Sequence, residues 1–390
     1  MQPVRESGGR GHVRRPRSRP PSPPGADPQR RWGRARGKFQ ALGRTVKVVV
    51  ILLLPLLFLV CSVPTGFLLE GPGPSFDLQS GITVRGARTY TARGELVLTS
   101  VSLWESRLFH HLADLCGRDY RMLAAREYLG EGLDVEEQDR VDEAVTLLSR
   151  NSAAVVGLRE AGVEVEVEEL GVLVVSVEKG YPAEGRLRAG EVIVSVDGVA
   201  ARNAVELGEL VAAAPEGGQV VLGVREMDGD ALHAAWEGGE DVELSALLSG
   251  EVREVSVSPV WEPELARRVI GVSTRDYFDY TSGVRVEWEM EAVKGPSAGL
   301  MLALSLVNAL TPEDITRGRK VAGTGEIFPD GRVGPIGGLP MKIRAAEARG
   351  AEAFLYPAGN REDLVGVSTS LRLVPVENLE DALRALSEQG

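Results

Sequence analysis

One serine and one lysine of this chain have the surroundings that nucleophilic catalysis needs. Ser297 lies between small residues in the segment KGPSAG at residues 294–299, and Lys342 follows the segment GGLPM at residues 337–341. A serine hydroxyl becomes a good nucleophile only when a neighbouring base removes its proton. The histidines cannot supply that base from within the same domain, because all four lie upstream: His12, His110, His111 and His233.

Lysine is the remaining candidate for the base. The chain has only six lysines against 38 arginines, so a lysine at position 342 indicates a role that arginine cannot fill, the release of a proton. The apolar run before Lys342 predicts partial burial. Lowering the pKa of a lysine from about 10.4 to about 7.5 takes about 4 kcal/mol of differential desolvation, which a buried site can supply.

The segments around both residues have the pattern of an α/β domain. Ser297 stands at the head of the apolar run 300–310, which predicts a helix with Pro296 in its first turn. A helix N-terminus favours negative charge, so an oxyanion formed by attack of Ser297 would be stabilised there. Strands are expected at 321–327 and 353–356, and helices at 342–349 and 379–386.

Three ordered motifs carry a resemblance to a known family. The segments GPSAG at 295–299, TGE at 324–326 and PIGGL at 335–339, followed by Lys342, are similar in residues, order and spacing to the proteolytic domain of Lon-type serine proteases. The resemblance covers roughly residues 265–390. It implies a serine–lysine dyad, with Ser297 as nucleophile and Lys342 as general base, and supporting roles for Thr324, Gly295 and Ala298.

One position departs from the family pattern. Many Lon proteases carry an acidic residue three positions before the serine, where this chain has Lys294, which we expect to be a solvated loop charge. The sequence contains no Gly-x-x-x-x-Gly-Lys-Ser/Thr phosphate-binding loop, so we expect neither the ATP-driven domain of cytosolic Lon nor a cofactor. The resemblance also implies ring-shaped self-association.

Residues 163–258 predict a second, β-rich domain. The succession Gly-Val-Leu-Val, Gly-x-Pro-Ala, Leu-x-Ala-Gly-Glu-x-Ile and Val-Asp-Gly looks like a PDZ domain of the type found in bacterial proteases. That resemblance implies a groove in which an extended peptide adds a strand, its terminal carboxylate bound by the backbone N–H groups of Leu170, Gly171, Val172 and Leu173. The alternative is a generic small β-rich domain. Residues 226–250 look like an acidic insertion and are expected to form a solvated loop.

The N-terminal part predicts a membrane anchor. Residues 1–47 hold thirteen basic residues against two acidic ones and few apolar residues, which is typical of a disordered tail. Residues 48–69 are uncharged and long enough to cross a bilayer as one helix. The basic tail places the N-terminus in the cytoplasm and the remainder outside the bacterial cell membrane. A cleaved signal peptide is the main alternative, although no Ala-x-Ala cleavage site follows.

Residues 70–162 carry no chemistry that the sequence reveals. Strands are expected near 82–84 and 95–103, and helices over 105–160. The trio His110, His111 and Cys116 matches no familiar metal spacing, so no metal site is expected. The only other cysteine, Cys61, lies in the apolar segment, and a disulfide with Cys116 is not expected.

Together these features predict an α/β (α+β) Lon-type proteolytic domain at 263–390, a PDZ-like domain at 163–258 and a single transmembrane helix. The expected activity is an ATP-independent serine endopeptidase that cleaves unfolded or exposed extracytoplasmic proteins. The whole chain has a net charge of −12 in spite of its basic tail, so the part after the tail is strongly acidic. That charge argues against nucleic acid as a partner. Two alternatives stay open: a non-catalytic membrane-tethered PDZ scaffold with a vestigial protease fold, and an enzyme resembling signal peptidase that cuts near the membrane.

Overall fold

The computed structural model describes residues 48–49, 51–54, 59–60, 62–108, 120–124, 135–238, 242–289 and 293–388. The chain divides into two compact units, residues 1–63 and residues 64–390. The expectations for the basic tail, the two cysteines and the histidine pair fall outside the described residues.

The expected transmembrane segment differs from the structure at its C-terminal end. Residues 64–69 are not helical: they open strand β1 (Pro64–Asp77), which pairs with β3 (Glu95–Arg107). The described residues between 48 and 60 are helical, but within the described part of the chain no helix is both long and apolar enough to cross a membrane. The uncharged stretch before β1 is therefore shorter than the sequence suggested.

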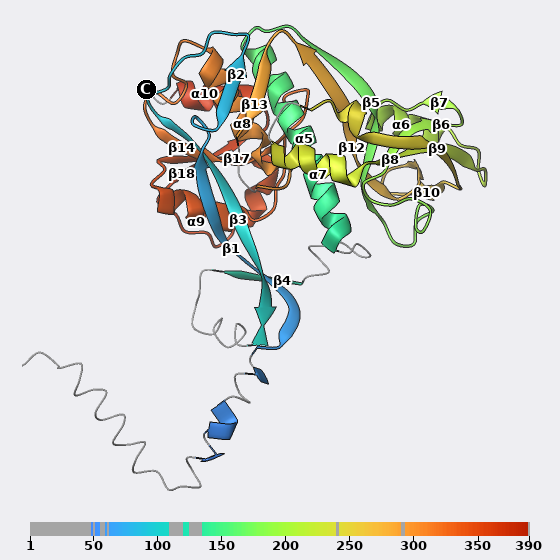
Figure 1. The fold of residues 1–390 in the computed structure, drawn as a ribbon, viewed down its shortest axis with the longest axis horizontal. Helices are drawn as coiled ribbons and strands as arrows, with labels where there is room; N and C mark the ends of the chain where they lie inside the picture. Colours follow the sequence, from blue (N-terminus) through green and yellow to red (C-terminus); the bar gives the residue numbers. More distant parts are fainter. Residues whose placement is uncertain are drawn as a thin grey trace, which may run out of the picture. The chain divides into compact units, whose positions relative to one another are not determined.

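Strands from distant parts of the chain form one six-stranded sheet (Figure 1). Its order is β18-β17-β14-β3-β1-β4, in which β3, β14, β17 and β18 run parallel and β1 and β4 are antiparallel to their neighbours. The C-terminal strands are β14 (Lys320–Gly323), β17 (Ala353–Pro357) and β18 (Arg372–Val376), and β4 is Arg121–Ala124. Residues 70–162, which the sequence left as a separate segment, thus supply strands to the sheet that carries the C-terminal motifs.

Helices cover both faces of this sheet. Successive strand residues point to opposite sides, so a strand of consecutive apolar residues places apolar side chains on both faces. Leu96 and Leu98 pack with helices α5 (Val135–Glu160), α8 (Gly299–Leu310) and α10 (Leu379–Ser387). Val97, between them, packs with α9 (Leu339–Arg349) on the other face. The three strand residues are at most 1% exposed, so β3 is a central strand of the core. The helices expected over 105–160 are confirmed only for α5, since β3 runs on to Arg107 and β4 follows.

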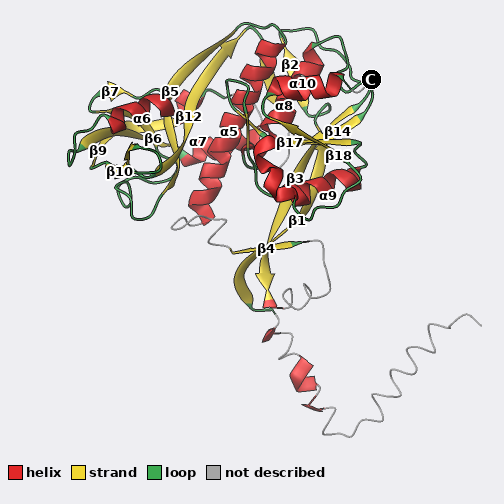
Figure 2. Cartoon of the chain, turned by 180° about the vertical axis from the view of Figure 1, so that it is seen from behind, coloured by secondary structure: helices red, strands yellow, loops and turns green. Residues whose placement is uncertain are grey.

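A second sheet, seen in Figure 2, is formed by residues that lie in sequence between the two halves of the first sheet. Its order is β12-β5-β6-β8-β9, with the short β7 (Val199–Ala200) paired to β6. Its strands are β5 (Val165–Val177), β6 (Val192–Val196), β8 (Val220–Met227), β9 (Leu248–Val257) and β12 (Val272–Ser282). Helix α6 (Ala204–Ala212) packs on this sheet through Leu207 and Val211, and β12 forms one of its edges.

The acidic insertion is a helix rather than a solvated loop. Residues Gly229–Gly238 form α7 between β8 and β9, followed by the 3₁₀ turn η1 (Leu244–Leu247). Leu232 and Ala235 of α7 are buried against α5, so apolar residues at helical spacing outweighed the acidic composition.

Three short antiparallel strand pairs of the described residues lie outside the two sheets. Strand β2 (Ile82–Arg85) pairs with β13 (Arg285–Trp288), β10 (Val260–Glu262) with β11 (Arg267–Val269), and β15 (Glu326–Ile327) with β16 (Val333–Gly334). The 3₁₀ turns η2 (Pro296–Ala298) and η3 (Ala358–Leu364) precede α8 and β18.

Candidate active site

Ser297 lies in the 3₁₀ turn η2, which runs into α8 as the sequence predicted. Gly295 caps the turn with a φ of 98°, a conformation that favours glycine, and Pro296 occupies the first turn. Ala298 is 4% exposed and anchors the turn in the core. The residues of α8 from Gly299 to Ala309 are all buried, which fixes the start of the helix and with it the position of the serine.

The structure brings Ser297, Lys342 and Thr324 together. The ammonium nitrogen Nζ of Lys342 lies 2.7 Å from Oγ of Ser297 and 3.1 Å from Oγ1 of Thr324. The Thr324 hydroxyl donates in turn to the backbone carbonyl of Ser297 at 3.0 Å, and the N–H of Gly325 donates to the same carbonyl at 2.9 Å. Thr324 therefore holds the lysine tip and the serine backbone in a fixed relation.

Burial prepares Lys342 to act as a base. The residue is 3% exposed, and this burial lowers its pKa to about 8, against a smaller opposing effect of the Glu70 charge. Lys342 lies in the first turns of α9, whose cap Gly338 has a φ of 72°, and the Lys342 N–H donates to the Gly338 carbonyl. With a pKa of about 8, roughly a tenth of the molecules carry a neutral Lys342 at pH 7 and about half at pH 8, far more than for an exposed lysine, and the neutral form is the one that can abstract a proton.

Glu70 of β1 is a residue of this site that the sequence did not reveal. Its side chain is 5% exposed, and Oε1 lies 2.7 Å from where a Cβ on Gly338 would be. Its other oxygen, Oε2, is buried without a hydrogen-bond partner among the described residues. Burial raises the pKa of the Glu70 carboxyl, Arg121 and Lys342 lower it, and Asp363 raises it. The only sequence signal was an acidic residue directly after an apolar run.

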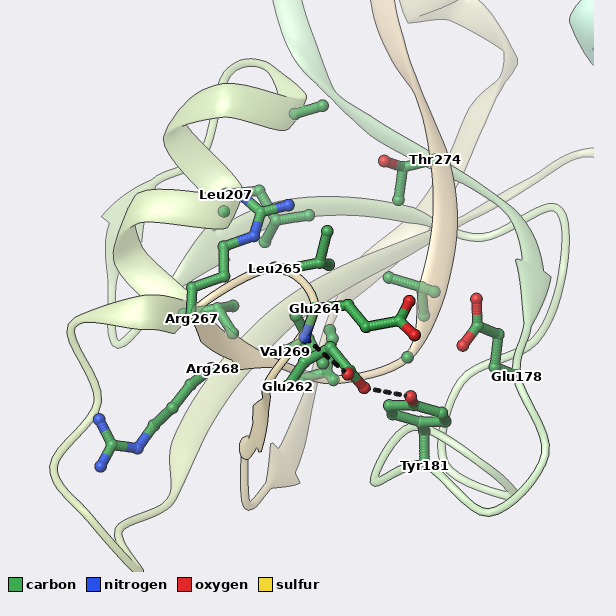
Figure 3. A pocket seen from close by; sticks show the side chains of 16 residues that line it. Glu178, Tyr181, Leu207, Glu262, Glu264, Leu265, Arg267, Arg268, Val269 and Thr274 are labelled. Carbon is green, nitrogen blue, oxygen red and sulfur yellow. Dashed lines mark hydrogen bonds between the residues drawn. The ribbon is translucent and has the colours of Figure 1, made fainter.

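A groove also opens beside the edge strand β12 of the second sheet (Figure 3). It has a volume of about 300 Å³ and lies between α6 and the segment from β10 to the start of β12. Leu207 and Val211 of α6, Leu265, and Val272 of β12 supply apolar lining. Gly271 has a φ of 78°, and a Cβ there would overlap Tyr181, whose hydroxyl donates to Glu262.

Comparison with known proteins assigns both parts of the chain. Residues 282–388 match the Lon protease (S16) C-terminal proteolytic domain, and residues 173–226 match the PDZ domain. The chain therefore carries a Lon-type proteolytic domain and a PDZ domain. The homologous proteases and the matched domain identify the C-terminal part as a serine protease domain.

The relatives are longer proteins named Lon protease, and this chain spans only a small part of their length. Lon protease 1 of Myxococcus xanthus is 40% identical over 118 residues, which are 29% of this chain and 14% of that protein. Lon protease of Heliobacterium modesticaldum is 31% identical over 168 residues, 41% of this chain and 20% of that protein. Lon protease 3 of Sorangium cellulosum is 44% identical over 94 residues, 23% of this chain and 11% of that protein.

Among solved structures, the PDZ domain of an SdrC-like protein from Listeria innocua is 21% identical and covers 27% of this chain and 92% of that chain, with a TM-score of 0.20. The PDZ domain of an SdrC-like protein from Listeria monocytogenes is 18% identical and covers 27% of this chain and 87% of that chain, also with a TM-score of 0.20.

The structure places the four predicted carboxylate-binding residues of the PDZ domain inside its sheet. Leu170, Gly171, Val172 and Leu173 lie in β5, which has neighbours on both sides. Val172 and Leu173 pair with β6 on one side and with β12 on the other, so their backbone faces sheet partners rather than an open groove. The sequence pattern identified the strand correctly but gave no information on which strand would be at the edge.

No metal-binding site is found among the residues that the structure describes. Within those residues, no group of three or more His, Cys, Asp or Glu side chains is arranged to hold a metal ion.

Proposed function

We propose that this chain is a serine endopeptidase in which Ser297 attacks the peptide carbonyl and Lys342 acts as general base. Neutral Lys342 takes the proton of the Ser297 hydroxyl as the oxygen bonds to the carbonyl carbon, which gives a tetrahedral oxyanion. The ammonium of Lys342 then protonates the leaving amine as the C–N bond breaks. Water then attacks the acyl-enzyme while Lys342 accepts its proton, and Lys342 returns that proton to the Ser297 oxygen as the acyl C–O bond breaks.

The observation that carries this proposal is the 2.7 Å contact between Nζ of Lys342 and Oγ of Ser297 at a lysine that is 3% exposed. A buried ammonium without such a task is costly, because charge is poorly solvated in a protein interior. Thr324 accepts from Nζ and fixes its direction, so the lone pair of the neutral amine faces the serine hydroxyl. We propose the supporting roles of Gly295 and Ala298 on the same ground, since both hold the turn η2.

The test compares wild-type protein with Ser297→Ala on casein, an unfolded substrate. We expect the variant to lose casein hydrolysis by at least about 10³-fold. A fluorophosphonate probe should label the wild type at Ser297, as located by mass spectrometry of its peptides. Equal turnover by the two proteins, or labelling at another serine, would refute the dyad and leave a PDZ scaffold as the better interpretation.

We further propose that the PDZ domain captures an extended peptide in the groove between α6 and the free edge of β12. The edge position of β12 supports this, because an unpaired strand edge is a template for an added strand. Apolar lining from Leu207, Val211 and Leu265 would receive a side chain of the peptide. The groove replaces residues 170–173 as the proposed capture site.

The wider setting of the enzyme is also a proposal. The missing phosphate-binding loop in the sequence supports activity without ATP, on chains that are already unfolded or exposed. The basic tail and the uncharged residues 48–63 support anchoring in a bacterial cell membrane with the folded part outside. Alkaline carbonate extraction of cell membranes would test the anchor, since an anchored protein should stay in the pellet. The homo-oligomeric ring implied by the Lon resemblance stays a prediction.

A further inference from the structure

Helix α5 holds the backbone of the two residues that precede Ser297. The N–H of Gly295 donates to Oγ1 of Thr146 at 2.7 Å, and the hydroxyl of Ser149 donates to the carbonyl of Pro296 at 3.0 Å. Thr146 and Ser149 are one helical turn apart, so they lie on the same face of α5. Each of them therefore binds one residue of the serine loop, which we define as residues 294–297.

The next turn of the same face continues the row. Oε1 of Glu143 lies 3.0 Å from Nζ of Lys294, and Oδ1 of Asp139 lies 3.4 Å from the same nitrogen. Lys294 is thus held by two carboxylates and is not the solvated loop charge that the sequence suggested. Glu143, Thr146 and Ser149 contact Lys294, Gly295 and Pro296 in matching order.

These polar side chains of α5 are buried, which makes their bonds to the loop significant. Glu143 is 4%, Thr146 3% and Ser149 5% exposed. Buried polar groups destabilise a protein unless they are hydrogen-bonded, so a row of three on one helix face requires partners. Thr146 also donates its hydroxyl hydrogen to the carbonyl of Asp142, which leaves an oxygen lone pair for the Gly295 N–H.

The start of α8, directly after the serine loop, lies close enough to α5 to leave no room for a further atom at Gly299. A Cβ on Gly299 would lie 2.9 Å from Oγ of Ser149 and 2.9 Å from the backbone nitrogen of Ile327. Such distances are well inside van der Waals contact. Any shift of α5 towards the active site would therefore move the start of α8 and the serine with it.

Helix α7 contacts Glu143 of α5 and Lys294 of the serine loop. Nδ1 of His233 lies 2.9 Å from Oε1 of Glu143, and Nζ of Lys294 lies 4.8 Å from the centre of the Trp236 ring. Because α7 lies between β8 and β9, both strands of the PDZ sheet, these contacts join that sheet to the loop that carries the nucleophile.

We propose that α5 and α7 form a clamp that positions Ser297 against Lys342, with Thr146, Ser149 and Lys294 as its positioning residues. The clamp binds residues 294–296 of the serine loop, while Thr324 donates to the carbonyl of Ser297. Through α7 it connects the peptide-capturing domain to the nucleophile. This inference rests on the proposed peptidase function, because alignment of the serine matters only if it is the nucleophile.

The test measures kcat and KM on casein, and the rate of Ser297 labelling by a fluorophosphonate, in the full chain. Thr146→Val removes the acceptor for the Gly295 N–H while keeping the shape of the side chain. We expect kcat and the labelling rate to fall about tenfold, with KM within about twofold of wild type. Thr146→Ser should restore most of the loss. Ser149→Ala should act like Thr146→Val, more weakly.

The matched control is Ser152→Ala on the same helix. Ser152 is 5% exposed, as Ser149 is, so the two substitutions remove the same hydroxyl from equally buried positions of α5. Ser152→Ala should leave kcat unchanged. Lys294→Met tests the outer part of the clamp by removing the ammonium that Asp139 and Glu143 bind, and it should also lower kcat rather than raise KM. If Thr146→Val does not fold, Lys294→Met tests the clamp in its place.

The outcomes separate the two proposals. If wild type is active and Ser297→Ala is inert, but Thr146→Val and Lys294→Met keep wild-type kcat and labelling rates, the clamp is refuted and the peptidase stands. If kcat falls equally in Ser152→Ala, the effect reflects general damage to α5, which also contradicts the clamp. A wild-type protein that neither cleaves casein nor reacts with the probe refutes the peptidase, and the clamp with it.

Discussion

Lys342 acts as a base only in its neutral form, so its pKa sets the acidic limit of activity. Burial lowers this pKa to about 8. Below that pH the amine is protonated and cannot accept the Ser297 proton, so kcat/KM should rise with pH and level off above about 8. The nearby Glu70 carboxylate opposes the effect of burial, because a negative charge favours the protonated lysine.

Glu70→Gln should move this acidic limb to lower pH. Without the carboxylate the pKa of Lys342 falls further, so the lysine becomes neutral at a lower pH. The plateau should drop about threefold to tenfold, because a weaker base stabilises the transition state less. A pH profile of kcat/KM on casein measures both effects.

Glu191→Gln is the control for this substitution. Glu191 is 4% exposed, so it is as buried as Glu70, but it pairs with Arg253 in the PDZ domain. An unchanged midpoint in Glu70→Gln would show that Glu70 does not act on Lys342.

The residues of the site differ in how far the sequence could reveal them. Ser297, Thr324 and Lys342 lie in compact motifs whose order is enough to propose their proximity, and the structure brings them together. Glu70 and Thr146 reach the same place from strands and helices far away in sequence. Neither stands in a local pattern that signals chemistry, because their roles come from tertiary packing alone.

At the scale of the elements, the groove between α6 and β12 predicts a difference between substrate binding and turnover. Leu265→Asp puts a charge into the proposed apolar lining, where Leu265 is 55% exposed and its replacement should not disturb the core. We expect KM for casein to rise about tenfold with kcat nearly unchanged, because the lost contact acts on binding and not on the dyad.

Val252→Asp is the matched control for that substitution. Val252 is 52% exposed and lies on β9, outside the residues that line the groove. Its KM should equal that of wild type. A rise of KM in both variants would point to a general effect of added charge, and a rise in neither would place peptide capture elsewhere.

Element types were predictable where the pattern was regular and the partners were local. The motifs of residues 163–258 indicated a β-rich domain, and the structure has β5, β6, β8 and α6 in that range. The edge position of β12 was not predictable, because it depends on which strands pair and both edges of a strand look alike in sequence. Helix α7 was missed because the acidic composition of residues 226–250 hid the two apolar positions that it buries, Leu232 and Ala235.

At the scale of the whole molecule, the sheet of the Lon-type domain is built from both ends of residues 64–390. β14 lies between β3 and β17, and β1 covers the other side of β3. The PDZ sheet is inserted between these halves in sequence. The part of the chain that matches the Lon proteolytic domain starts at residue 282, so it does not include β1 or β3. A sequence match does not report how far a sheet extends.

This arrangement predicts that residues 263–390, the domain limits suggested by the sequence, do not fold alone. Without β1 and β3 the core loses Leu69, Leu96, Val97 and Leu98, each at most 4% exposed. Burial of such side chains contributes about 1.5–3 kcal/mol each, roughly 6–12 kcal/mol together. That equals most of the stability of a typical domain, about 5–15 kcal/mol.

Two fragments should therefore behave differently. Residues 64–390 should show a cooperative thermal transition by circular dichroism and react with the fluorophosphonate at Ser297. Residues 263–390 should show no such transition and no labelling, although they contain Ser297, Thr324 and Lys342, because β14 would lose its partner β3 and leave the site without a frame. A folded and reactive 263–390 fragment would mean that β1 and β3 only cover a sheet that is stable without them.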